Sequence, residues 1–184
     1  KGALYDIRME YFDNGLRAFA QLGWDMVPAE GIKNAVERAR NADAIIAVVG
    51  MKDDENGDRA YLELDDAQEQ LILALAETGK PLVVVIQTGT VIAMKKWIDK
   101  ADAVLVAWYP GEEGGRAIAE IVMGDVNPSA KLPLTFPKTT GQVPMNYNHL
   151  PYKPADFYTG IGNEPQFPFG HGLSYTTFAY SNLR

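Results

Sequence analysis

Apolar and polar residues alternate with a period of two at the start of the chain. Tyr5, Ile7, Met9 and Tyr11 are separated by charged residues, and the alternation resumes beyond Asn14-Gly15 and continues to Trp24. Such alternation predicts strands with one buried face, and Asn-Gly favours a tight hairpin turn. Because a two-stranded hairpin is barely stable alone in water, we expect residues 1–27 to belong to a larger β-structure.

The hydrophobic period changes after residue 28. Ile32, Ala35, Val36 and Ala39 have the spacing of one helical stripe, and the apolar run 43–50 follows them. Two further apolar runs, over 81–87 and 103–107, have the length and composition of strands buried on both faces of a parallel sheet.

Helices are predicted between and after these strands. Asp65 can cap a helix that carries Gln68 at the reciprocal capping position and ends at Gly79. A shorter helix is expected through Met94 and Trp97, and another over residues 112–123. The alternation of strands and helices predicts an α/β domain over residues 28–137, with an open, mostly parallel sheet and flanking helices.

The regular pattern ends after Pro137. Residues 138–172 contain five prolines, namely Pro144, Pro151, Pro154, Pro165 and Pro168, so we expect an extended linker. Residues 173–184 alternate imperfectly and predict one more strand.

Composition excludes several classes of function. The 184 residues carry 17 Lys and Arg against 24 Asp and Glu, a formal charge of −7, which argues against a nucleic-acid surface. No apolar run approaches the roughly 20 residues of a membrane-spanning helix. Cysteine is absent and there are only two histidines, which argues against disulfides and against thiolate or multi-histidine metal sites. The compartment stays open between bacterial cytoplasm, periplasm and secretion.

The segment that follows the first predicted strand is the main candidate for chemistry. Ligands of open α/β sheets bind beyond the carboxyl ends of the strands. This segment contains Asp53, Asp54, Glu55 and Asp58, with Arg59 at its end. A carboxyl group here could act as a general acid/base, whereas the alternative is a solvated acidic turn. The order of the carboxylates does not fit a calcium loop.

A second loop, residues 108–115, follows the third predicted strand. Its glycines could bind an anion at a helix start, but Glu112 and Glu113 repel phosphate, and the loop lacks the known glycine patterns for phosphate. A structural turn is therefore favoured, and a nucleotide-binding module ranks last. His149 and His171 have no nucleophile pattern beside them, so both are interpreted as structural.

Several segments, taken in order, resemble family-three glycoside hydrolases. The first resembles that family's acid/base loop, and the others resemble its later motifs and the segment leading into its fibronectin type III domain. They are Glu55–Arg59 with Leu62–Leu64 and Gln68, then Trp108–Gly115, Gly124–Ser129, Lys131–Pro137 and Phe167–Phe178.

The resemblance implies retaining hydrolysis of β-linked sugars from the non-reducing end, with a β-glucoside as the first choice of substrate and a β-xyloside as the second. Glu55 corresponds to the acid/base, Asp58 and Arg59 to supporting residues, and Asp53 and Asp54 are the neighbouring candidates. The nucleophile, an aspartate, is expected on a barrel domain carried by a complementary polypeptide outside this chain. No cofactor is implied.

The same resemblance suggests a division of the chain. Residues 1–27 would be the terminal hairpin of a protective-antigen-type β-sandwich, 28–137 the α/β sandwich domain, 138–172 the extended linker, and 173–184 the first strand of a fibronectin type III-like domain. The competing interpretation is a non-catalytic carbohydrate-binding or scaffold fragment of the same fold.

Overall fold

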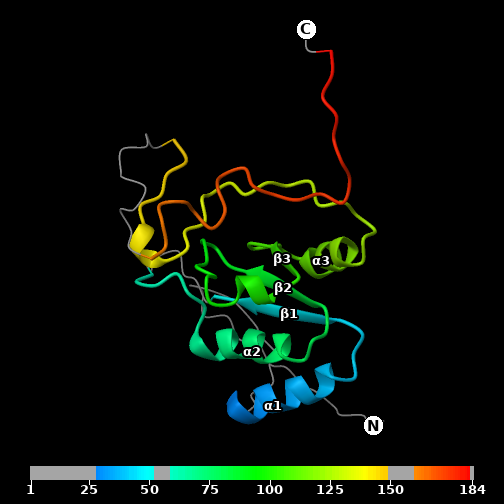
Figure 1. The fold of residues 1–184 in the computed structure, drawn as a ribbon. Coiled ribbons are helices and arrows are strands. Elements are labelled where there is room, and N and C mark those ends of the chain that lie inside the picture. The colour runs from blue at the N-terminus through cyan, green and yellow to red at the C-terminus, as the bar shows by residue number, and fades with distance from the viewer. Residues whose placement is uncertain (1–27, 52–58, 149–159, 183–184) are drawn as a thin grey trace, which may run out of the picture.

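A computed structural model describes residues 28–51, 59–148 and 160–182 (Figure 1). The hairpin predicted for residues 1–27 therefore lies outside the described residues. In chain order the elements are α1 (Pro28–Ala39), β1 (Ile45–Gly50), α2 (Asp66–Ala76), β2 (Leu82–Gln87), the 3-10 helix η1 (Ile98–Lys100), β3 (Ala103–Val106), α3 (Gly114–Val122) and the 3-10 helix η2 (Thr140–Gln142).

The three strands form one parallel sheet in the order β1-β2-β3. Ile45 lies opposite Leu82 and Gly50 opposite Gln87, while Val83 pairs with Ala103. The predicted α/β fold with an open parallel sheet is confirmed. Within the described part of the chain, β1 is an edge strand, and its Ile46 and Val48 are 46% and 57% exposed.

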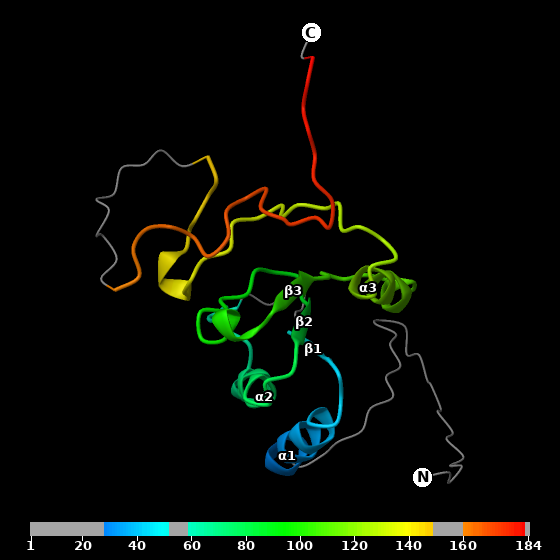
Figure 2. The same ribbon diagram turned by 45° about the vertical axis from the view of Figure 1, so that its right-hand side comes forward.

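The helices lie on two sides of the sheet. Figure 2 shows α2 on one side of the strands and α3 on the other, with α1 next to α2. The core between the sheet, α2 and the connecting segments is closed by large apolar side chains that are fully buried: Ile72, Leu82, Val84, Ile86, Ile92, Met94, Trp97 and Phe136. This core fixes the strand ends, and the loops that follow them extend from a rigid base.

The short helix expected through Met94 and Trp97 is reduced to a turn. The N–H groups of Trp97 and Ile98 both donate to the carbonyl of Met94, and η1 follows directly. Met94 and Trp97 are buried, so the helical spacing of these two residues marks the inner side of one turn and the prediction of a helix was wrong.

The proline-rich segment packs on the domain where it is described. Phe136 forms an isolated antiparallel bridge with Phe167, and Leu132 exchanges two hydrogen bonds of 2.8 Å with His171 and Gly170. Buried Gln142 accepts from the N–H of Lys138 and donates to the carbonyls of residues 162 and 164. Residues 138–148 and 160–172 of the expected linker, called the strap below, thus pack on the domain beside the sheet (Figures 1 and 2).

Residues 173–182 run away from the domain as irregular chain (Figure 1). Tyr175 still donates to the carbonyl of Ile121, but Tyr180 is 96% exposed. A strand needs a neighbouring strand, and none lies beside these residues in the described ranges. The fibronectin type III-like strand therefore stays a prediction. No helix in these ranges has the length and apolar character to cross a membrane.

Candidate functional site

All three strands point their carboxyl ends to one edge of the sheet. Met51 follows β1 there, Thr88 follows β2, and Ala107 follows β3. Of the predicted site residues, Arg59 is described, whereas Glu55 and Asp58 fall within residues 52–58, outside the described residues. Asp53 and Asp54 fall in the same gap.

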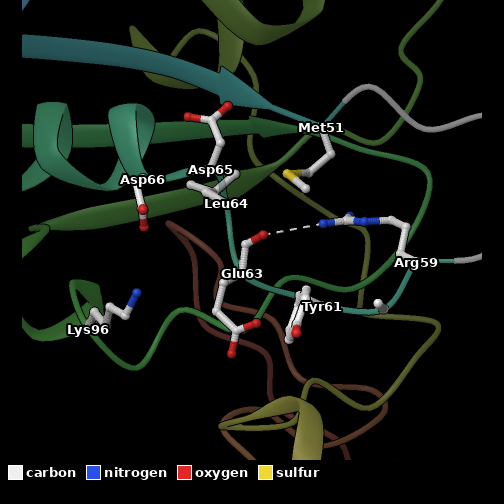
Figure 3. A pocket seen from close by; sticks show the side chains of 9 residues that line it. Met51, Arg59, Tyr61, Glu63, Leu64, Asp65, Asp66 and Lys96 are labelled. Carbon is white, nitrogen blue, oxygen red and sulfur yellow. Dashed lines mark hydrogen bonds between the residues drawn. The ribbon is translucent and has the colours of Figure 1, made fainter.

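A pocket of about 620 Å³ lies at this edge. Met51 and Arg59, which flank residues 52–58 on either side, both line it (Figure 3). The remaining lining residues come from the approach to α2 and from the segment before η1: Ala60, Tyr61, Glu63, Leu64, Asp65, Asp66 and Lys96. The pocket is rich in carboxylates and carries two cations, and Tyr61 adds an aromatic ring that is 74% exposed.

Arg59 is held by the segment that leads to α2, residues 59–65, which is called the pocket loop below. Its Nη2 atom donates to the carbonyl of Glu63 at 3.3 Å, which is the hydrogen bond drawn in Figure 3. The guanidinium is therefore turned toward the pocket lining. The supporting role of Arg59 stays a prediction.

Thr140 of the strap holds the pocket loop in place. Thr140 accepts a hydrogen bond from the N–H of Leu62 at 3.1 Å, and its hydroxyl donates to the Glu63 carboxylate at 3.2 Å. The N–H of Ala93 donates to the Leu62 carbonyl, so this residue is held on both sides. Sequence reasoning missed Thr140, because nothing local indicates a contact 78 residues away.

An ion pair joins the exposed Lys96, which lines the pocket, to the buried Glu69. Lys96 Nζ is 2.5 Å from Oε2 of Glu69, whose side chain is only 5% exposed. The hydrogen bond to Glu69 and the negative charge of Glu69 raise the pKa of Lys96 above the ordinary lysine value. Desolvation opposes this shift, and the charges of Asp66 and Glu63 add to it. No local pattern in the sequence indicates this pair, whose partners are 27 residues apart.

Replacing Lys96 by Met should lower the melting temperature by a few degrees at neutral pH. The buried Glu69 carboxylate would lose its cation, and its second oxygen, Oε1, already has no hydrogen-bond partner in the described structure. Because the pKa of Lys96 is raised on folding, the pair stabilises the protein fully below the ordinary lysine pKa of about 10.4 and is lost as pH rises through the higher folded value.

Thermal unfolding of both proteins at a series of pH values measures this effect. The difference in melting temperature should stay constant through the neutral range and shrink only in strong alkali. Lys95→Met, at the neighbouring exposed lysine, is the matched control. An equal loss in the two variants would contradict a specific role for the pair.

The second loop has the geometry of a structural turn. Trp108 has a positive φ of 51° and packs edge-on against Phe136, with ring centroids 6.1 Å apart. Gly114 starts α3 so close to Pro110 that an added Cβ would lie 2.5 Å from the proline ring. His171 stacks on Phe167, which fits its structural interpretation, while His149 lies outside the described residues. Among the residues described, no three acidic or histidine side chains gather as a possible metal site.

Comparisons with known proteins identify the chain's family. The family described as glycosyl hydrolase family 3 C-terminal domain matches residues 4–175. A periplasmic β-glucosidase of Salmonella typhimurium is 43% identical over 169 residues, and a β-xylosidase of Formosa agariphila is 40% identical over 166 residues. Each alignment covers 85% of this chain and 22% of the relative.

Solved structures agree with the sequence comparison. The β-glucosidase of Listeria innocua, whose structure was solved in complex with glucose, is similar with a TM-score of 0.74 at 35% identity, covering 86% of this chain and 23% of that one. A β-glucosidase of Erythrobacter marinus gives a TM-score of 0.75 at 39% identity, covering 84% and 22%. The chain thus spans less than a quarter of the length of these relatives, and it belongs to glycosyl hydrolase family 3, matching the C-terminal domain of that family.

Proposed function

We propose that this chain supplies Glu55 as the general acid/base of a retaining, exo-acting β-glycosidase, with a β-glucoside as substrate. The nucleophile, an aspartate, lies on a barrel domain outside this chain. Retaining hydrolysis needs two carboxyl groups about 5–5.5 Å apart on either side of the glycosidic bond. One protonates the leaving oxygen and later activates water, while the other forms the glycosyl-enzyme. The two halves of the site therefore have to meet at the pocket.

One observation carries the proposal. Met51 and Arg59 flank the segment that contains Glu55, and both line one pocket at the carboxyl edge of the sheet. The segment that carries Glu55 therefore begins and ends at the pocket, which supports a role there for its carboxylate. The names of the relatives, β-glucosidases and a β-xylosidase, support the substrate class.

The flanking regions complete the proposal. Residues 1–27 form the terminal hairpin of a protective-antigen-type insert, and residues 173–184 begin a fibronectin type III-like domain. The exposed apolar side chains of the C-terminal segment support the second assignment, since Leu173, Tyr175 and Phe178 are 79%, 60% and 65% exposed. Such side chains are expected to pack against further strands.

Reconstitution tests the division of labour. This chain is mixed with a polypeptide that carries the family's barrel domain, and native mass and hydrolysis of an aryl β-glucoside are measured. We expect a complex of one copy of each that hydrolyses the substrate, whereas neither part does so alone. A complex without hydrolysis would favour the scaffold interpretation, and hydrolysis by the barrel polypeptide alone would overturn the proposed role of this chain.

A further inference from the structure

The side chain of Gln68 joins the start of α2 to the end of β1. It projects from the first turn of α2 and bonds the last residue of β1, Gly50. The N–H of Gly50 donates to Gln68 Oε1 at 2.8 Å, and Gln68 Nε2 donates back to the Gly50 carbonyl at 2.8 Å. Nε2 also donates to Oδ2 of Asp65, the residue that caps α2, at 2.6 Å.

In this arrangement the Gln68 side chain supplies the hydrogen bonds that a neighbouring strand would otherwise give to Gly50. Gly50 is paired with Gln87 of β2 on its other side, and β1 is an edge strand in the described part of the chain. A carboxamide carries one acceptor and two donors in one plane. It can therefore bond a backbone N–H and a backbone C=O as a peptide group does, and one donor remains for a further partner. The Gln68 side chain therefore satisfies both backbone groups of Gly50 on the open side of β1.

The backbone of Gly50 is packed closely against the end of β2. A Cβ built at this residue would lie 2.2 Å from the carbonyl oxygen of Gln87. The next residue, Met51, donates to the same carbonyl at 3.1 Å. The strand end is thus fixed between β2 on one side and Gln68 on the other, directly before residues 52–58.

We infer that Gln68 is a positioning residue for the proposed acid/base Glu55, because it fixes the backbone of Gly50, the last residue of the strand that leads into the segment carrying Glu55. This inference rests on the proposed function. Within the described ranges, Gln68 lines no part of the pocket and its carboxamide bonds only Gly50 and Asp65. A displaced catalytic group loses rate steeply, because proton transfer depends on distance and direction.

The test uses the assembled enzyme, in which this chain is combined with the barrel-domain polypeptide. Gln68→Met keeps the length and helix propensity of the side chain and removes the three hydrogen bonds of the carboxamide, two with Gly50 and one with the Asp65 side chain. Gln70→Met is the matched control, because Gln70 is an exposed glutamine on the same helix. Rates are compared for an alkyl β-glucoside, which needs a proton on its leaving oxygen, and for an activated aryl β-glucoside, which does not.

The Gln68→Met change should lower kcat/KM for the alkyl glucoside by roughly 10- to 100-fold and for the aryl glucoside by much less. Gln70→Met should leave both rates as they are. In a Glu55→Gln background the Gln68 change should add no further loss for the alkyl glucoside, because the proton donor is already gone. A purely structural role would lower both rates by the same factor and would add in the double variant.

A second variant covers the case in which Gln68→Met does not fold. Gln68→Glu keeps an acceptor for the Gly50 N–H and replaces the donor with an oxygen that faces the Gly50 carbonyl and Asp65. It should show the same selective loss for the alkyl glucoside. Equal losses for both substrates, or none, in the variant that folds would overturn the inference while Glu55→Gln still showed selectivity. No selectivity in Glu55→Gln itself would instead overturn the proposed function, and the positioning role with it.

Discussion

Replacing Glu55 by Gln in the assembled enzyme should lower kcat/KM for an alkyl β-glucoside by about 10²- to 10⁴-fold, the usual contribution of general acid/base catalysis. The amide keeps the size of the side chain but cannot release a proton to the departing oxygen. An activated aryl leaving group departs as a stable anion without that proton. Formation of the glycosyl-enzyme from an activated aryl glucoside should therefore be slowed far less, and this difference is measured by steady-state and burst kinetics on both substrates.

The neighbouring carboxylates provide the controls. Asp53→Asn and Asp54→Asn remove the same kind of charge within the same segment. Each should produce a smaller loss that does not depend on the leaving group. If the selectivity appears in Asp54→Asn instead, the acid/base is Asp54; if Glu55→Gln loses the same small factor on both substrates, Glu55 has no acid/base role.

Replacing Phe136 by Ala should destabilise the protein by about 3–5 kcal/mol, the range typical of large aromatic residues removed from a core. Phe136 is fully buried and packs edge-on against Trp108. Its backbone also forms the bridge to Phe167 that holds the strap over the sheet. The change would leave a cavity at the joint between strap, sheet and second loop. Urea denaturation measures the loss in the free energy of unfolding.

Phe178→Ala is the matched control, because that ring is 65% exposed in the C-terminal segment. Its effect on the free energy of unfolding should stay within about 0.5 kcal/mol, as for most surface changes. Similar losses in the two variants would mean that Phe136 does not lie at the centre of the packing described above.

Local signals were sufficient to predict most of the fold. The period of apolar residues located the strands to within two residues, and Asp65 caps α2 through a 2.9 Å bond from the N–H of Gln68. Gln68 was expected to complete a reciprocal cap, but its side chain is used by Gly50, 18 residues earlier. A capping pattern depends on local sequence only, whereas the hydrogen-bonding needs of an edge strand depend on the tertiary fold. Here Gln68 Oε1 accepts from the Gly50 N–H of the edge strand instead of completing the cap.

The candidate site was harder to predict for the same reason. The position of Arg59 at a strand end follows from topology, and the structure places this residue at the pocket. Thr140 and Lys96 reach the same region from distant segments. The residues next to them in sequence do not indicate that Thr140 contacts Leu62 or that Lys96 contacts Glu69. The proline content of residues 138–172 predicts irregular chain correctly, but it carries no information on where that chain packs.

The anchor that Thr140 provides has a consequence for synthesis. Thr140 is made 78 residues after Leu62, which it holds. At the usual rate of about 5–20 residues per second, the ribosome needs roughly 4–16 s to cover that distance. During this interval α2, β2, β3 and α3 are synthesised, while the pocket loop has to wait for its anchor. All three strands are therefore available to pair before Thr140 can fix the pocket loop.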